Sequence, residues 1–235
     1  MNFFLIKTSD SCYDNISEIC HNAISNAAID LELCMRGSRN LISSEKELHK
    51  IAEVGDKILV SFEGKYVPWI IINKDKEALT INSEDCLKEK AFDKETNKWK
   101  DSAIRKYLNG KYFKDKFEKE FLKLVSDDLI GTEDYTTTDK FWLLSHEEIG
   151  NKGNDSLKKN CETKHFKYFS SRVKRIKEIW NKDGEREARF WWLRSACAND
   201  CSSVGLVSDG GYISNNFAYN LYGGLSPACS IICNR

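Results

Sequence analysis

Apolar residues near the start of the chain recur at intervals of three and four positions, which is the spacing of an amphipathic helix. This pattern covers residues 11–35 and follows a short apolar run at residues 2–6 that predicts a first strand. A second helix is predicted to begin at Ser44, because Glu47 lies three positions later and completes a capping box. Gly55 is the predicted end of this helix.

The pattern then changes to that of strands. Runs rich in β-branched and aromatic residues occupy residues 56–62, 66–72 and 78–81, and turn sequences separate them. We interpret the three runs as an antiparallel meander. Pro68 lies in the second run and has no N–H to donate, so it predicts an edge strand or a bulge there.

Charged stretches follow the meander. Residues 88–125 have a helical pattern that Asn109 and Gly110 interrupt. The side chains predicted to face inward are Ala103, Tyr107, Phe113, Phe117, Phe121, Leu122 and Val125. Residues 141–144 predict a short strand, followed by a helix with Ser145 as its N-cap. The polar residues 150–189 predict an exposed loop and a basic helix around residues 172–182.

Residues 190–235 differ from the rest of the chain in composition. Aromatic, small and amide side chains alternate through them, and the charged residues are few. Such a mixture is typical of a surface that recognises a partner by contact. Predicted strands lie at 189–193, 203–207, 212–214 and 228–233. Asp209 and Gly210 between two of them predict a tight primed turn.

Charge and hydropathy exclude several classes of protein. The 36 basic residues balance the 36 acidic ones, so no net field draws the chain to nucleic acid or to an anionic membrane. No apolar run approaches the roughly 18 residues of a transmembrane helix, and residues 1–7 do not form a signal peptide. We therefore expect a cytoplasmic protein, with virion association or non-classical export as alternatives.

Several dispersed motifs resemble one family. The order Trp-Leu-Arg-Ser at 192–195, Val-Ser-Asp-Gly at 207–210 and Tyr-Gly-Gly-Leu-Ser-Pro-Ala at 222–228 is similar to the endings WLRS, SDG and YGVRPA of a family of bacterial and phage domains of unassigned function. Residues 67–71, 104–110 and 141–145 resemble its upstream motifs. Ser226 departs from the pattern, because the family has arginine there.

This resemblance implies an α+β, C-type-lectin-like fold of the kind that formylglycine-generating enzymes share. It covers about residues 55–235, so residues 1–54 are interpreted as an N-terminal strand and helix segment. The same fold serves as the variable proteins of diversity-generating retroelements, in which a C-terminal cassette is rewritten. The mixture of residue types at 196–203 and 212–223 resembles such a cassette.

The expected function is therefore that of a non-enzymatic module that binds a ligand or protein through its C-terminal loops. Tyrosine gives rigid contact area, and asparagine and serine give adaptable hydrogen bonds. The candidate binding residues are Asn199, Asp200, Ser202, Tyr212, Asn215, Asn216, Phe217, Tyr219, Asn220 and Tyr222. The alternative for each is a loop residue that bonds its own backbone. The residues interpreted as scaffold are Trp191, Trp192, Arg194, Asp209, Gly210 and Pro227.

Two other functions stay open at this point. A formylglycine-generating-enzyme-like oxidoreductase would use cysteines, yet its copper-binding motif is not recognisable. A nucleic-acid-binding accessory protein would use the basic and aromatic stretch 164–182, for which a solvated helix is the alternative.

No cofactor, catalytic residue or metal is predicted. Cys197, Cys201, Cys229 and Cys233 would be the ligands of a structural zinc, but Cys229 and Cys233 on one strand would lie about 13 Å apart. His146 is isolated in the sequence, with no cysteine placed beside it.

Overall fold

The computed structural model describes residues 3–8, 16–23, 41–42, 44–131, 134–150, 156–158 and 165–233. These residues combine helices with antiparallel sheets, which confirms the predicted mixture of α and β structure. They form two compact units, and each unit contains separate stretches of the chain. The division at residue 54 stays a prediction.

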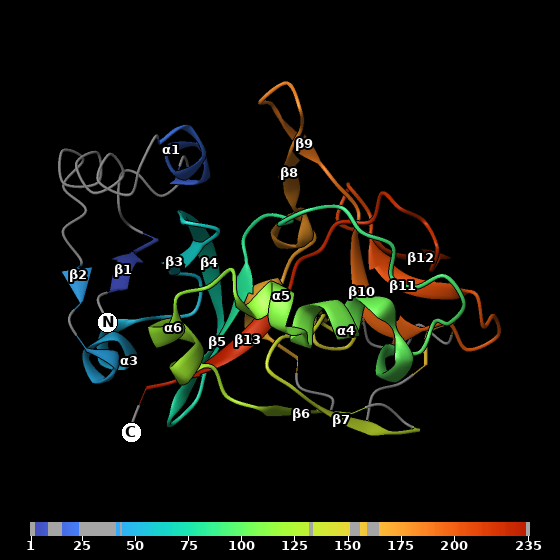
Figure 1. The fold of residues 1–235 in the computed structure, drawn as a ribbon, viewed down its shortest axis with the longest axis horizontal. Helices are drawn as coiled ribbons and strands as arrows, with labels where there is room; N and C mark the ends of the chain where they lie inside the picture. The colour runs from blue at the N-terminus through green and yellow to red at the C-terminus, as the bar shows by residue number, and fades with distance from the viewer. Residues whose placement is uncertain are drawn as a thin grey trace. The chain divides into compact units, whose positions relative to one another are not determined.

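The first unit comprises Met1–Glu84, Lys111–Ser126 and Cys229–Arg235. It is built on a six-stranded sheet with the order β13-β5-β4-β3-β1-β2 (Figure 1). The strands are β1 (Phe3–Ile6), β2 (Leu41–Ile42), β3 (Lys57–Phe62), β4 (Lys65–Lys74), β5 (Ala78–Ser83) and β13 (Ala228–Ile232). Because β13 pairs with β5, the predicted last strand returns to the sheet of the first strands.

The predicted meander is confirmed by β3, β4 and β5, which pair antiparallel in sequence order. Glu63 and Gly64 form the two-residue turn between β3 and β4, with φ of 53° and 77°. Such left-handed pairs match the twist of adjacent antiparallel strands.

Pro68 is placed differently from the prediction. Its strand β4 lies between β3 and β5, so the edge position is wrong, and the register shift of β4 lies between Ile71 and Asn73 and not at Pro68. The Pro68 carbonyl accepts the N–H of Glu84 at 3.0 Å, directly after β5 ends. The N–H that proline lacks would lie at the end of the β4–β5 ladder, so its absence removes no hydrogen bond from the interior of the ladder.

Among its described residues, the first unit has four helices: α1 (Ile16–Asn22), α3 (Glu45–Ile51), α5 (Lys111–Lys114) and α6 (Lys119–Leu124). Ser44 caps α3 as predicted, because its hydroxyl accepts the N–H of Glu47 at 3.2 Å. α1 lies within the predicted helix of residues 11–35, and residues 11–15 and 24–35 lie outside the described residues. Phe117 joins α5 and α6 to the sheet through ring contacts with Phe62 and Trp69.

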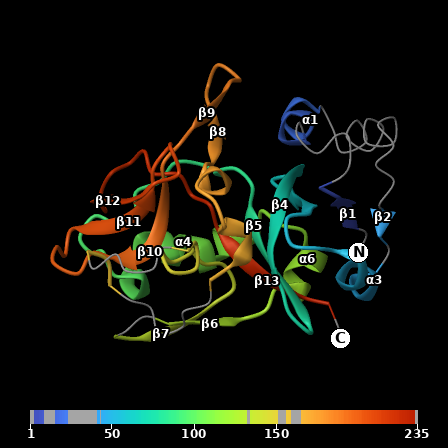
Figure 2. The same ribbon diagram turned by 180° about the vertical axis from the view of Figure 1, so that it is seen from behind.

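The second unit comprises Asp85–Gly110 and Asp127–Ala228. Its main sheet is β10 (Trp191–Ala196), β11 (Ser203–Val207) and β12 (Ile213–Phe217), in that order. In the described part of this unit, two strand pairs accompany it: β6 (Asp128–Gly131) with β7 (Thr136–Asp139), and β8 (Glu178–Trp180) with β9 (Arg186–Ala188). Its helical elements are α4 (Ala103–Asn109) and the 3-10 turns η2 (Trp99–Asp101), η3 (Lys167–Phe169) and η4 (Val173–Arg175). Figure 2 shows β8 and β9 as a narrow arm that extends away from the main sheet.

Predictions for the middle of the chain are wrong at four places: residues 88–98, residues 141–144, the helix expected after Ser145, and residues 172–182. Residues 172–182 form η4 and β8 in place of a basic helix, because Asn181 and Gly184 reverse the chain; the Asn181 side chain accepts two backbone N–H groups, and Gly184 has a φ of 77°. Residues 141–144 form no strand beyond an isolated bridge of Trp142.

The predicted helical range 88–125 is also shorter than expected. Residues 88–98 are not helical, and the buried positions of α4 are Ile104 and Leu108, whereas Ala103 is exposed. Ser145 and Glu148 do exchange the two hydrogen bonds of a capping box, but the chain after them forms turns and not a helix.

Candidate functional site

The turn between β11 and β12 orients one end of the candidate surface. Its left-handed residue is Gly211, with φ of 79°, whereas Asp209 and Gly210 have negative φ. The predicted primed turn is therefore wrong, since both types of primed turn need positive φ at the first central residue. Gly211 lies against the backbone of Arg172, whose guanidinium sits over the Tyr212 ring at 4.4 Å and bonds its hydroxyl.

Strand β12 is the edge strand of its sheet. The backbone groups of its successive residues point alternately toward β11 and away from it. The N–H of Ala218 donates to Ser202 and that of Ser208 to Tyr212, so the even-numbered residues face β11. Ile213 and Asn215 consequently turn their backbone groups away from β11. Within the described part of the chain, nothing bonds to these outward groups.

Large apolar side chains are exposed on β12, in the turn before it and in the loop after it. We call this set the β12 surface; its members are Tyr212, Phe217, Tyr219, Leu221 and Tyr222, and each is about half exposed or more. Phe217 and Tyr219 stack with ring centroids 5.2 Å apart and an interplanar angle of 6°. The stack gives the surface a flat, rigid aromatic face.

The neighbouring loop at residues 197–203 is held by its own hydrogen bonds. Asp200 accepts the N–H and the hydroxyl of Ser202, and hydrogen bonds from Ser202 and Ser203 lower the pKa of the Asp200 carboxyl. Asn97 donates to the carbonyls of Asp200 and Ser203 at 2.7 and 2.8 Å. Of the candidate residues here, only Asn199 is exposed without a hydrogen bond to another described residue.

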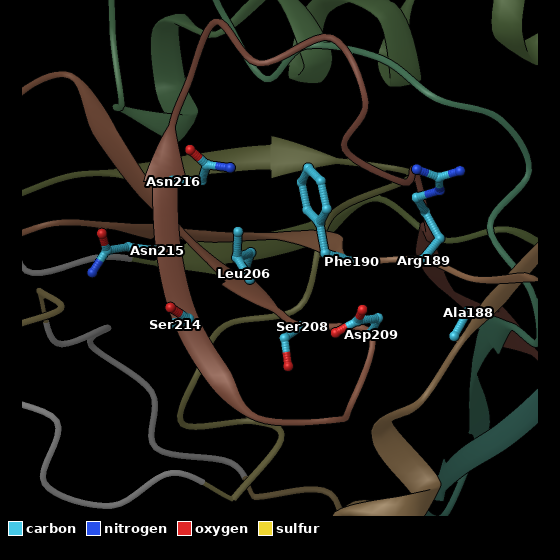
Figure 3. A pocket seen from close by; sticks show the side chains of 9 residues that line it. All are labelled: Ala188, Arg189, Phe190, Leu206, Ser208, Asp209, Ser214, Asn215 and Asn216. Carbon is cyan, nitrogen blue, oxygen red and sulfur yellow. The ribbon is translucent and has the colours of Figure 1, made fainter.

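An open pocket of about 310 Å³ lies beside β12 (Figure 3). Three stretches of chain line it: residues 188–190, the residues Leu206, Ser208 and Asp209, and residues 214–216. Leu206 forms its apolar floor, the Phe190 ring stands at one side, and Asn216 stands at the other. The pocket brings together the candidates Asn215 and Asn216 with residues that the sequence analysis did not propose: Ala188, Arg189, Phe190, Leu206, Ser208 and Ser214.

Two candidate asparagines bond their own backbone, as the alternative reading stated. The side-chain oxygen of Asn216 accepts the N–H of Phe217 at 2.8 Å, and that of Asn220 accepts the N–H of Tyr222 at 2.9 Å. These bonds fix the backbone that carries the exposed rings. The Asn216 amide nitrogen stays on the pocket side.

Four of the six residues interpreted as scaffold are buried, namely Trp191, Trp192, Arg194 and Pro227, whereas Asp209 is exposed. Trp191 and Trp192 are fully buried, and their indole N–H groups donate to the carbonyls of Arg175 and Lys90 at 2.9 and 2.8 Å. Adjacent residues of a strand point to opposite faces, so the two rings pack on both sides of β10.

Arg194, predicted as a scaffold residue, lies in the interior and binds a carboxylate and a carbonyl. Its guanidinium donates to both oxygens of Glu148 at 2.6 and 2.9 Å and to the Leu143 carbonyl at 2.8 Å. Removing one partner of such a buried pair costs about 3–5 kcal/mol.

Three further residues of the motif Tyr-Gly-Gly-Leu-Ser-Pro-Ala have structural roles. A Cβ at Gly223 would overlap the Trp192 indole, and a Cβ at Gly224 would overlap the Cys86 thiol. Pro227 is buried. Close approach, and not an unusual φ, is what requires glycine at 223 and 224.

The sequence matches the family described as Domain of unknown function (DUF6273) over residues 71–232. The chain belongs to this family. The matched range contains the β12 surface, the pocket and the scaffold residues. No curated protein and no solved structure matches the chain.

The cysteines of this DUF6273 chain are separate and reduced where they are described. Cys20, Cys86, Cys197, Cys201 and Cys233 form no disulfide. Burial raises the pKa of Cys86 to about 12 and that of Cys197 to about 11, so both stay protonated thiols near neutral pH. No three His, Cys, Asp or Glu residues among those described form a group suited to a metal ion.

The cations of the basic stretch 164–182 are largely engaged within the fold. Lys177 is buried over the Trp191 ring at 5.3 Å, and Arg175 donates to the Ile149 carbonyl at 3.0 Å. Phe166 and Phe169 are buried as well. Lys164 lies outside the described residues.

His146 is placed beside a serine. Its Nδ1 lies 3.0 Å from the Ser195 hydroxyl, and both residues are buried. Burial lowers the pKa of His146, so the imidazole is neutral at pH 7. Among the described residues, no helix is both long enough and apolar enough to cross a membrane.

Proposed function

We propose that this DUF6273 chain is a non-enzymatic binding module that recognises an extended segment of a protein partner through the β12 surface. One observation carries the proposal: five of the eleven exposed large apolar side chains among the described residues fall within residues 212–222. Exposed apolar side chains gathered in one place mark interaction sites, whereas scattered ones do not.

The edge of β12 favours an extended partner. The outward backbone groups of Ile213 and Asn215 offer the hydrogen bonds with which a peptide adds a strand to a sheet. The ladder ends at Phe217, whose N–H is already bonded to Asn216 and whose carbonyl is bonded to Asn220. A short segment of the partner would thus pair with the strand, while its side chains contact the rings.

The buried base of the unit supports recognition without rearrangement. Arg194 with Glu148, the two tryptophans and Asn97 hold the loops by side-chain hydrogen bonds. A preorganised surface loses less entropy on binding than a floppy one.

The finer fold belongs to the same proposal. We assign a C-type-lectin-like arrangement to the family domain, supported by the places of the resembling motifs. The WLRS motif is the buried strand β10, the SDG motif is the β11–β12 turn, and the final motif leads into β13. An experimental structure compared with lectin-like folds tests this assignment.

The proposed relation to retroelement variable proteins rests on which side chains are exposed to solvent. Most of the exposed aromatic and amide residues that the structure describes lie in 196–203 and 212–223, apart from the buried scaffold motifs. A reverse transcriptase gene and a near-repeat of the cassette close to the coding sequence are expected; a genomic neighbourhood that lacks both refutes the relation.

The enzyme and nucleic-acid alternatives have less support. The buried cysteines Cys20, Cys86, Cys197 and Cys233 have raised pKa values, which disfavours a nucleophilic thiolate. Arg172, Arg175 and Lys177 contact groups of the chain itself.

A displayed library of random peptides tests the proposed function. Peptides selected on the immobilised full chain should bind the variant Phe217→Ser, Tyr219→Ser, Tyr222→Ser about tenfold or more weakly, because truncation of aromatic contact residues is costly. Tyr212 is left intact, since it contacts Arg172. The control is Leu129→Ser, which removes an equally exposed side chain elsewhere. Equal binding to the triple variant, with unchanged Tm, would contradict the proposal.

A further inference from the structure

We infer that the pocket beside β12 receives a positively charged side chain, arginine or lysine, of the segment that the β12 surface binds. This inference rests on the proposed function and adds the chemistry of the partner at one position. The volume of about 310 Å³ lies at the low end of ligand sites, which suits one long side chain.

The charge of the pocket comes from Asp209. This residue is exposed, and no cation among the described residues forms an ion pair with its carboxylate. Figure 3 shows the carboxylate on the same side of the pocket as the Phe190 ring, with Leu206 between them and Asn216. A cationic group that enters the pocket therefore meets an acceptor of opposite charge.

The cations near Asp209 are held by other groups. Arg189 also lines the pocket, but its guanidinium is 3.3 Å from the Glu89 carboxylate and contacts that of Glu187. Arg172 lies against Gly211 of the same turn and is held over Tyr212. The carboxylates of Glu89 and Glu187 carry two negative charges against the one positive charge of Arg189, so the local net charge is negative.

The apolar walls suit the rest of such a side chain. Phe190 packs edge-on against Trp192 with centroids 5.5 Å apart, which fixes its orientation. A guanidinium or ammonium group is attracted to an aromatic face. The methylene groups of arginine and lysine cover apolar surface while the charged end reaches a polar partner, and Leu206 supplies that surface.

Two small probes that differ in charge test the inference on the full chain. Nα-acetyl-arginine methylamide and its neutral citrulline counterpart are titrated separately while amide resonances are followed by NMR. The arginine probe should shift the resonances of Leu206, Ser208 and Asn216 saturably. The citrulline probe should bind at least about fivefold more weakly, because it lacks the charge that would form one partly exposed ion pair.

Variants locate the effect. Asp209→Asn keeps the shape of the side chain and should reduce the binding of the arginine probe about fivefold, whereas Asp183→Asn, an exposed carboxylate of the β8–β9 turn, should leave it unchanged. Equal shifts with both probes, shifts that map outside the pocket, or the absence of any shift would overturn the inference.

The outcomes separate the inference from the proposed function. If selected peptides depend on Phe217 and Tyr219 but show no enrichment of arginine or lysine and no response to Asp209→Asn, the inference fails and the function stands. If the arginine probe binds at the pocket while no peptide depends on the aromatic residues, the function fails instead.

Discussion

Arg194 shows how single side chains fix the loops beneath the β12 surface. It joins β10 to the Glu148 carboxylate and the Leu143 carbonyl, and the neighbouring Ser195 hydroxyl meets the backbone and the ring of His146. Every one of these groups lies in the interior. Buried polar groups of this kind determine one loop arrangement, because any other arrangement leaves a donor or a charge unpaired.

The neutral state of His146 makes stability depend on pH. Burial, with Arg194 as a further cause, lowers the folded-state pKa of this histidine below its ordinary value of 6.5. The unfolded chain therefore binds more protons than the folded one just below pH 6.5, so the free energy of unfolding should fall as the pH decreases through this window. The slope from one such group is at most about 1.4 kcal/mol per pH unit.

Denaturant unfolding of wild type and His146→Gln between pH 7.5 and about 5 measures this effect. The glutamine variant retains a group that bonds Ser195 and should show a smaller loss of stability with acidification. His21, whose pKa is also lowered by burial, contributes with the same sign in both proteins. Identical pH profiles would show that His146 does not titrate in this range.

At the scale of elements, the β11–β12 turn determines where the rings of the β12 surface lie. Gly211→Ala should destabilise the chain by about 1–3 kcal/mol, because its φ of 79° is strained for alanine and the added Cβ would overlap the Arg172 carbonyl. Gly210→Ala is the matched control. Its Cβ would make only ordinary contacts with Tyr212, and its φ is not positive. Unfolding midpoints that rank the two variants in the reverse order would contradict this assignment.

Short-range sequence patterns predicted many elements correctly. They failed where contacts between residues far apart in the sequence determine the local structure. The meander from residue 57 to 83, the Ser44 cap and β11 followed from local spacing and turn residues. The prediction of a helix at 172–182 was wrong. It assumed that the charged residues lie on an exposed helix surface, whereas Lys177 is buried on Trp191.

The candidate site was predictable only in part for the same reason. The exposed rings lie within one stretch of sequence, and its composition identified them as candidates. The pocket joins residues 188–190 to residues 206–209 and 214–216, and strand register determines which of them are neighbours. Phe190 and Leu206 carry no local signal that separates a pocket residue from a core residue.

At the scale of the whole molecule, neither unit is a continuous stretch of chain. The first unit takes its strands from residues 3–83 and from β13, so both ends of the described chain contribute to one sheet. Strand β1 pairs with β3, and Leu59 packs in a cluster with Ile16 and Ile19. Residues on both sides of the predicted boundary at residue 54 thus share a core.

A chain of residues 55–235 tests that boundary. We expect a lower unfolding midpoint than for the full chain, because removal of β1 and α1 exposes Leu59, whose burial alone is worth about 2 kcal/mol, and leaves β3 as an open edge. We also expect self-association, which light scattering measures. Leu59→Thr provides a matched comparison: it should reduce the association of the shortened chain, yet destabilise the full chain, in which Leu59 is buried. A monomeric shortened chain with the midpoint of the full chain would instead support the boundary at residue 54.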